Sequence, residues 1–281
     1  MVRGLAIRQS MDRACVPADL DLVVPAMAYS HLGGARTHTF ALQMDLWKDP
    51  ATADRSELAR LLRSLAPDLL IVDLFWVPIA NMTLTMPTWL LLRSIPPAWL
   101  VGPPQAPFQA DRHERILAME PAPLLERFEQ LGPVVYTDPD LASRARRDEL
   151  AAVLGVPADR PLRLVMRAGE AVDDALLQQR AAALGGSWSR MELGSASSVF
   201  PLSHWLAALQ PGDEVISGTG FNSFWEAALL GYGAHMHWVP MPRRIDDQQW
   251  RGSLVADAPV RATQNGADRL AELVRVRLGP A

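Results

Sequence analysis

The residues best suited to chemistry lie in the stretch SGTGFNSFWEAALLG, which runs from Ser217 to Gly231. Its first half is a turn rich in glycine and small polar residues, and its second half has the apolar spacing of a helix. Glycine lets the backbone approach a ligand closely, and a helix N-terminus offers N–H groups and partial positive charge to a phosphate. The donors Thr219, Asn222 and Ser223 strengthen this interpretation. The turn therefore predicts an anion site, and the alternative is a tight turn before a capped helix.

Glu226 lies one helical turn after Asn222, on the same face of the expected helix. Its carboxylate can accept hydrogen bonds from a pair of sugar hydroxyls, and phosphate at the glycines with ribose at Glu226 would suit a nucleotide diphosphate. A second polar segment, VPMPRRIDDQQWR, places Asp247 and Gln248 where a carboxylate and an amide can meet sugar hydroxyls. The structural alternatives are a carboxylate favoured by the helix dipole and a solvated loop.

The elements that must position these residues alternate along the chain between short apolar runs and helical patterns. The runs predict strands, and the helical patterns predict intervening helices, among them Ser56–Leu65, Val172–Leu184 and Ala267–Leu278. The expected strands are Leu20–Val24, Asp68–Leu74, Pro87–Arg93, Val134–Tyr136, Leu162–Met166, Asp213–Ser217 and His235–Val239. Because these runs are apolar throughout, we predict an α/β fold with parallel sheets. Ligands bind such sheets at the carboxyl ends of the strands, where the glycine turn lies.

Length and composition limit the alternatives. The chain has 281 residues, enough for two domains, and we expect a boundary that separates residues 1–136 from residues 137–281. A net charge of −4 argues against nucleic acid as a partner. Cys15 is the only cysteine, so the sequence predicts neither a disulfide nor a cysteine-based metal site. No signal peptide and no apolar run of transmembrane length is recognisable, which predicts a cytoplasmic protein.

The two polar segments together resemble the donor-binding region of GT-B glycosyltransferases, such as the UDP-glycosyltransferases and the bacterial cell-wall N-acetylglucosaminyltransferase. Plant members carry a box of the form H-C-G-W-N-S-x-x-E, and the residues from Gly218 to Glu226 align with it without gaps. The matching positions are Gly220, Asn222, Ser223 and Glu226, followed by Gly231, Pro240 and the pair Asp247-Gln248.

The resemblance implies two Rossmann-like domains facing a cleft, with the nucleotide sugar bound by the C-terminal domain. It implies phosphate contacts from Gly220–Ser223, ribose contact from Glu226, and donor-sugar contact from Asp247 and Gln248. Gly218 and Thr219 open the box, and Gly218 replaces a histidine that contacts the diphosphate in the family.

The same resemblance places Ala168 and Gly169 at a candidate diphosphate turn. Family members usually open with a strand, a Gly-His loop and a helix, whereas MVRGLAIRQSM matches the helix alone. We therefore expect an N-terminal domain that lacks its first strand, either because the true start lies upstream or because the protein lacks these groups. In relatives the loop can supply the general base. The catalytic residue is therefore unknown, and His31, in the polar loop SHLGGARTH, is a candidate whose alternative is a surface histidine.

These patterns lead to a transferase hypothesis with two rivals. The expected reaction is inverting, metal-independent transfer from a nucleotide-diphosphate sugar, with UDP as the expected nucleotide, to an unknown small-molecule or lipid acceptor, without a further cofactor. The first rival is a nucleotide-sugar hydrolase or epimerase of the same fold. The second is a non-catalytic scaffold that binds a nucleotide sugar.

Overall fold

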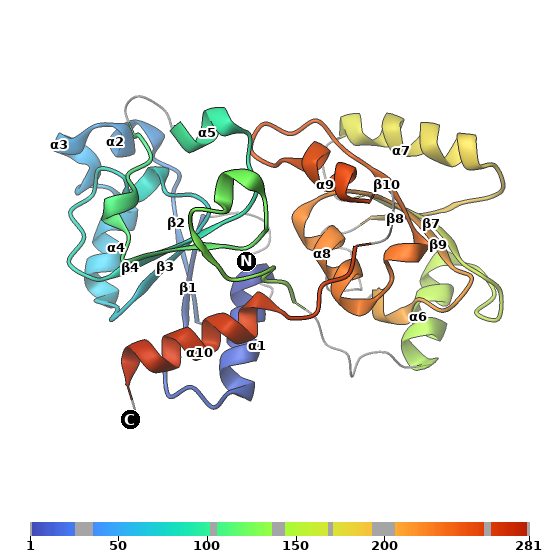
Figure 1. Cartoon of the computed structure of the whole chain (residues 1–281), viewed down its shortest axis with the longest axis horizontal. Coiled ribbons are helices and arrows are strands. Elements are labelled where there is room, and N and C mark those ends of the chain that lie inside the picture. Colours follow the sequence, from blue (N-terminus) through green and yellow to red (C-terminus); the bar gives the residue numbers. More distant parts are fainter. Residues whose placement is uncertain are drawn as a thin grey trace. The chain divides into compact units, whose positions relative to one another are not determined.

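The computed structural model divides into two compact units (Figure 1). The described residues are 2–25, 36–101, 106–136, 144–167, 171–192, 206–255 and 260–279. The first unit comprises Arg3–Val134 and the C-terminal segment that begins at Gly266, and the second comprises Val135–Asn265. Candidate residues His31, Ala168 and Gly169 lie outside the described residues.

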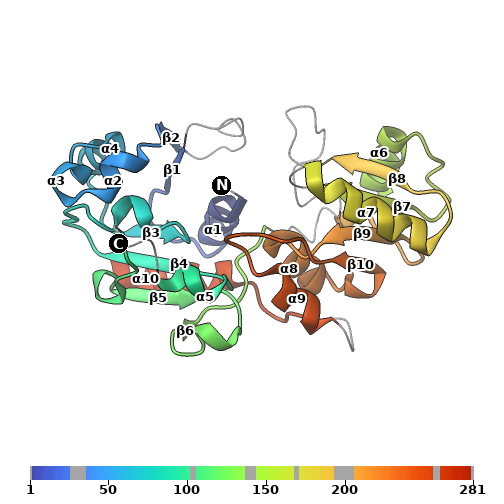
Figure 2. The ribbon, with the colours of Figure 1, turned by 90° about the horizontal axis from the view of Figure 1, so that it is seen from above.

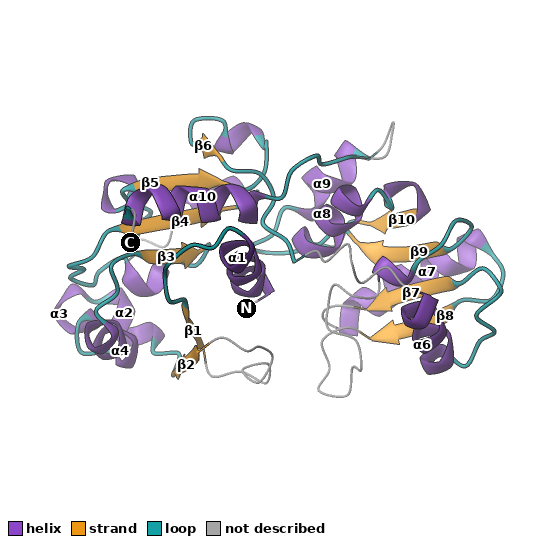
Figure 3. Ribbon diagram, turned by 90° about the horizontal axis from the view of Figure 1, so that it is seen from below, coloured by secondary structure: helices purple, strands orange, loops and turns teal. Residues whose placement is uncertain are grey.

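The strands of the first unit form two parallel sheets (Figure 3). One sheet pairs β1 (Asp21–Pro25) with β2 (Arg36–Phe40). The other has the order β3-β4-β5-β6, with β3 (Leu70–Asp73), β4 (Thr88–Leu92), β5 (Arg115–Ala118) and β6 (Glu129–Gln130). Among the described residues, β1 pairs only with β2, and β3 pairs only with β4.

Helices surround these sheets. They are α1 (Val2–Arg13), α2 (Met44–Lys48), α3 (Pro50–Ala53), α4 (Glu57–Leu65), α5 (Pro97–Val101) and α10 (Gly266–Leu278), with 3₁₀ turns η1 (Val77–Ile79), η2 (Ala110–Arg112) and η3 (Pro123–Leu125). Helix α4 begins where the sequence predicts, because Ser56 accepts a hydrogen bond from the N–H of Ala59 at 3.2 Å. Every residue of β4 is buried, as its apolar run predicts for a central parallel strand.

The C-terminal helix α10 packs against the first unit, whereas the boundary expected from the sequence assigned it to the second. It lies beside α1 in Figure 1, where the hydroxyl of Ser10 donates to the Asp268 carboxylate at 2.7 Å. The N–H of Gly266 donates to Pro133 O at 2.7 Å. A Cβ at Gly266 would lie only 2.2 Å from the backbone oxygen of Gly132, so the helix start is pressed against the preceding chain. The buried face of α10 consists of Gly266, Ala267, Leu270, Ala271 and Val274.

The second unit is a four-stranded parallel sheet with helices on both faces. Its strand order is β10-β9-β7-β8, with β7 (Arg163–Arg167), β8 (Ser189–Glu192), β9 (Glu214–Gly218) and β10 (Met236–Val239). Its helices are α6 (Arg144–Leu154), α7 (Ala171–Leu184), α8 (Phe221–Leu230) and α9 (Gln248–Leu254), with 3₁₀ turns η5 (Leu206–Ala208) and η6 (Gly233–His235). The predicted α/β class with parallel sheets is therefore confirmed.

Alternating side chains of the strands divide the core of this sheet into two layers. Val165 and Ile216 pack with Leu177 of α7, which lies along the sheet in Figure 2. Leu164 and Val215 belong to a second cluster that includes side chains from α6 and α8. Because β7 and β9 place apolar residues on both faces, their segments have hydrophobic runs in the sequence.

One strand prediction is wrong. Residues Val134–Tyr136 form no strand, although their apolar side chains suggested one. The backbone of Val135 is instead bound by the side chain of Asn265, whose Nδ2 donates to Val135 O at 2.7 Å and whose Oδ1 accepts from Val135 N at 3.4 Å. Among the described residues, no helix has the length and apolar character needed to cross a bilayer.

Candidate functional site

The glycine turn lies at the carboxyl edge of the sheet in the second unit. Strand β9 ends at Gly218, and α8 begins at Phe221 after only two residues. Gly220 occupies the N-cap position with φ −60° and ψ 147°, and as a glycine it has no side chain with which to cap the helix. An α-helix without a side-chain cap, starting at the carboxyl edge of a parallel sheet, is well suited to hold an anion.

Three of the remaining predicted donor residues lie in the same turn and helix. Thr219 is fully buried, whereas Asn222 and Ser223 in the first turn of α8 are half-buried. The helix ends at Gly231, whose φ of 78° is left-handed and favours glycine. Gly218, Thr219 and Gly220 therefore form the turn that ends β9, and Asn222 and Ser223 lie in the first turn of α8.

A buried polar cluster supports the turn from the side of α9, and we call Asp246, Gln248 and Arg251 the α9 brace. Arg251 has no exposed surface, and its Nη1 donates to Thr219 O at 3.1 Å and to Asp246 Oδ1 at 2.8 Å. The hydroxyl of Thr219 donates to the backbone oxygen of Gln248 at 2.7 Å. The brace therefore binds both the side chain and the carbonyl of Thr219.

The side-chain amide of Gln248 is used within the unit. Its Oε1 accepts from the N–H of Met241 at 3.1 Å, and its Nε2 donates to Asp246 Oδ2 at 3.2 Å. The side chain also lies next to the glycine turn: a Cβ built at Gly220 would be 3.8 Å from Gln248 Nε2. This geometry gives Gln248 a supporting position, in addition to the sugar contact that the resemblance implies.

Asp247 caps helix α9. Its Oδ1 accepts from the N–H of Trp250 at 3.0 Å, and the residue is half-buried. This bond satisfies one of the orphan donors at the start of α9. Asp247 therefore lies in the connection between β10 and α9, and its two neighbours in the chain, Asp246 and Gln248, belong to the α9 brace.

Glu226 is buried in α8 and its carboxyl has an unsatisfied atom. The residue is 2% exposed, and its Oε1 has no hydrogen-bond partner in the described structure. Burial raises the pKa of Glu226 well above its usual value of 4.5. A buried polar atom without a partner is costly, and among the described residues of the second unit Glu226 alone has a buried side-chain atom without a hydrogen-bond partner.

An ion pair that the sequence did not suggest lies between α7 and the segment that follows β10. Arg243 makes a two-pronged contact with Asp173, with Nη1 donating to Oδ1 at 2.9 Å and Nη2 bonding to Oδ2. Asp173 lies in the first turn of α7 and is 2% exposed. The pair fixes part of the chain that leads from β10 to α9. No local pattern signals it, because its partners are 70 residues apart.

The described histidines of the second unit do not lie at the glycine turn. The Nδ1 of His235 is 3.0 Å from Asp213 O, and the Nε2 of His237 is 3.2 Å from Glu214 Oε1. Asp213 and Glu214 mark the amino end of β9, whereas the turn follows its carboxyl end. In the first unit, the Nε2 of His38 lies 2.8 Å from Asp21 Oδ1.

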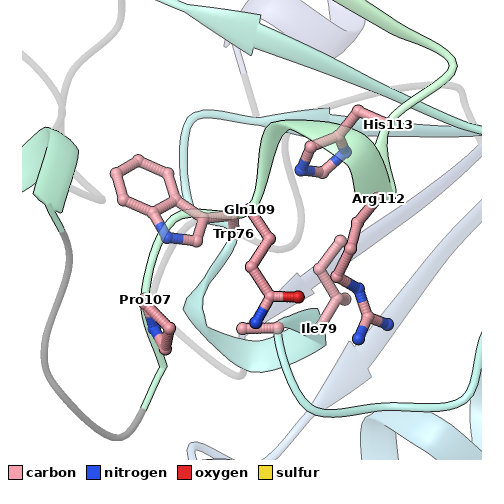
Figure 4. A pocket seen from close by; sticks show the side chains of 7 residues that line it. Trp76, Ile79, Pro107, Gln109, Arg112 and His113 are labelled. Atoms are coloured by element: carbon pink, nitrogen blue, oxygen red, sulfur yellow. The ribbon is translucent and has the colours of Figure 1, made fainter.

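The first unit contains a separate small pocket (Figure 4). Its empty volume is about 190 Å³ including space open to solvent, and its lining includes Trp76, Gln109, Arg112 and His113. Buried atoms Trp76 Nε1 and His113 Nδ1 have no hydrogen-bond partner in the described structure. Burial, with a contribution from the Arg112 guanidinium, lowers the pKa of His113 to about 4, so this imidazole is neutral at pH 7.

Comparison with known proteins adds no family to this picture. No family model matches the chain, and no curated protein shows significant similarity to it.

Proposed function

We propose that the second unit binds a nucleotide-diphosphate sugar, with UDP as the nucleotide, and that the protein is a GT-B glycosyltransferase. The observation that carries the proposal is the start of α8, which has a glycine at its N-cap and follows the glycine turn at the carboxyl edge of a parallel sheet. The diphosphate would lie at the N–H groups of Gly220–Ser223, where the helix dipole favours negative charge. The motif resemblance assigns the ribose hydroxyls to Glu226, and because this side chain is 2% exposed, the contact would require the nucleotide to open a path to its buried carboxyl.

The donor sugar is assigned to the segment after β10. Asp247 is half-buried, and we propose it as the carboxylate that contacts sugar hydroxyls. In the proposed reaction, an acceptor hydroxyl would attack the anomeric carbon with inversion. Donors at the helix start would stabilise the leaving diphosphate, because they are oriented before charge develops.

One observation favours a second candidate, a non-catalytic protein that binds a nucleotide sugar. Gly218 replaces the family's diphosphate-contacting histidine, and the described histidines of the second unit lie at the opposite end of β9. A binding protein would need the glycine turn and Glu226 but no general base. Sugar release from a UDP-sugar with a panel of acceptor alcohols distinguishes the candidates, because a binding protein retains the intact donor.

Calorimetric titration of the purified chain with UDP tests the nucleotide site. We expect Glu226→Ala to weaken UDP binding by about 1–3 kcal/mol, because the hydrogen bonds between the ribose hydroxyls and the carboxyl group are lost. The control is Glu126→Gln, which alters an exposed carboxylate of the first unit and should leave UDP affinity unchanged. A wild-type chain that binds no UDP would overturn the proposal, and equal affinity of wild type and Glu226→Ala would remove Glu226 from the site.

A further inference from the structure

We propose that Arg251 is a positioning residue of the nucleotide site, because the α9 brace orients the Thr219–Gly220 peptide toward the diphosphate. This inference rests on the proposed function and adds a residue that does not itself contact the ligand. Arg251 has no exposed surface, so its guanidinium acts through the groups that it binds.

The first step concerns the orientation of one peptide unit. Arg251 Nη1 donates to Thr219 O at 3.1 Å. Because a trans peptide is planar, its carbonyl and its N–H point in opposite directions. A Thr219 carbonyl held toward Arg251 therefore turns the N–H of Gly220 away from the brace. Among the described residues, this N–H has no hydrogen-bond partner, so it remains available for an anion.

The second step concerns the rigidity of the guanidinium. Asp246 Oδ1 accepts from Arg251 Nη1 at 2.8 Å and offsets its charge. The ring of Phe221 lies 5.5 Å from the guanidinium carbon, a cation–π distance. Both hydrogen bonds come from Nη1, and the flat guanidinium also lies over the Phe221 ring, a contact that a lysine ammonium on its flexible stem would not reproduce.

The third step is the contact between Gln248 and the turn. Its backbone oxygen accepts from the Thr219 hydroxyl at 2.7 Å, and Nε2 bonds to Asp246 Oδ2 at 3.2 Å. Thr219 is therefore held at its side chain by Gln248 and at its carbonyl by Arg251. This double attachment limits rotation of the peptide that precedes Gly220 and so prepares the anion site before the ligand arrives.

The test compares Arg251→Lys with Arg147→Lys by titration with UDP, uridine and inorganic pyrophosphate. Arg147 is a matched control, because it is also buried in the second unit and pairs with Asp213 just before β9. We expect Arg251→Lys to weaken UDP and pyrophosphate binding about tenfold and to leave uridine affinity nearly unchanged, since only the phosphate contact is disturbed. Arg147→Lys should lower the melting temperature while preserving the ratio of UDP to uridine affinity.

A second variant keeps the test decisive if Arg251→Lys fails to fold. Thr219→Val preserves the shape of the side chain but removes its hydrogen bond to Gln248, and it should weaken UDP binding in the same phosphate-dependent manner. Unchanged UDP affinity in the folded variants, or an equal loss for UDP and uridine, would overturn the positioning role alone. A wild-type chain that binds neither UDP nor pyrophosphate would overturn the proposed function and this inference with it.

Discussion

At the scale of single residues, Glu226 connects stability with ligand binding. Its carboxyl is buried and Oε1 has no partner, so the folded protein favours the neutral, protonated form. Ribose hydroxyls would donate to an ionised carboxylate, and nucleotide binding would then favour release of the proton. The same side chain that weakens the free protein at high pH would thus be satisfied by the ligand.

Glu226→Gln should make stability less dependent on pH. The pKa of Glu226 is raised on folding above its usual value of 4.5. Its contribution to stability is therefore fully present below pH 4.5 and is lost as the pH rises through the folded-state pKa. Glutamine has the same shape but no charge, so we expect the variant to equal wild type near pH 4.5 and to exceed its stability by about 1–3 kcal/mol at pH 8.

Urea unfolding of both proteins across this pH range measures the difference. The exposed Glu126→Gln serves as the control and should follow the wild-type pH profile. Parallel pH profiles for wild type and Glu226→Gln would show that the buried carboxyl finds a partner in solution.

At the scale of elements, the sequence predicted the strands and helix ends that depend on residues close together in the chain. The apolar runs of β4 and β9 and the serine before α4 were sufficient, because burial and capping depend on neighbouring residues. Strand β2, with the sequence RTHTF, was missed because its polar side chains lack the apolar pattern of a buried strand. The apolar Val134–Tyr136 became an extended connection because its backbone is paired with Asn265, 130 residues away from Val135.

The candidate site likewise has one part that the sequence predicted and one part that it did not. The glycine turn and the start of α8 were predictable, because glycine and small polar residues before a helix have a local meaning. The α9 brace was not, because the bond from Arg251 to Thr219 joins residues 32 apart in sequence. The charge-rich composition of the segment from Val239 to Arg251 was its only signal, and solvated loops share that signal.

Removal of the cap of α4 should destabilise the first unit. The buried Ser56 accepts from the N–H of Ala59 and donates to Ala53 O at 2.7 Å, so Ser56→Ala breaks two hydrogen bonds. We expect a loss of about 1–2 kcal/mol in the free energy of unfolding. Ser64→Ala, in the exposed last turn of the same helix, should change it by less than about 0.5 kcal/mol. Chemical denaturation of wild type and the two variants measures both effects. Equal losses of unfolding free energy in Ser56→Ala and Ser64→Ala would mean that the capping hydrogen bonds do not stabilise the first unit.

At the scale of the whole molecule, the chain leaves the first unit and returns to it. The second unit is an insertion between Val134 and Gly266, and the pair Val135 and Asn265 joins its two ends by hydrogen bonds. A unit whose ends meet can form its core without the flanking chain. Helix α10, by contrast, buries its apolar face in the first unit.

Two fragments therefore test the domain division against the boundary expected from sequence. Fragment 135–265 retains the Asn265 bonds, and we expect it to be monomeric and to bind UDP within about tenfold of the full chain, since the proposed nucleotide site lies in the second unit. Fragment 137–281 lacks Val135 and carries α10 with Leu270, Ala271 and Val274 exposed, so it should self-associate. Size-exclusion chromatography and calorimetry compare the two. If fragment 137–281 were the better-behaved monomer, α10 would belong to the second unit in solution. If fragment 135–265 folded but bound no UDP while the full chain did, the first unit would supply part of the nucleotide site.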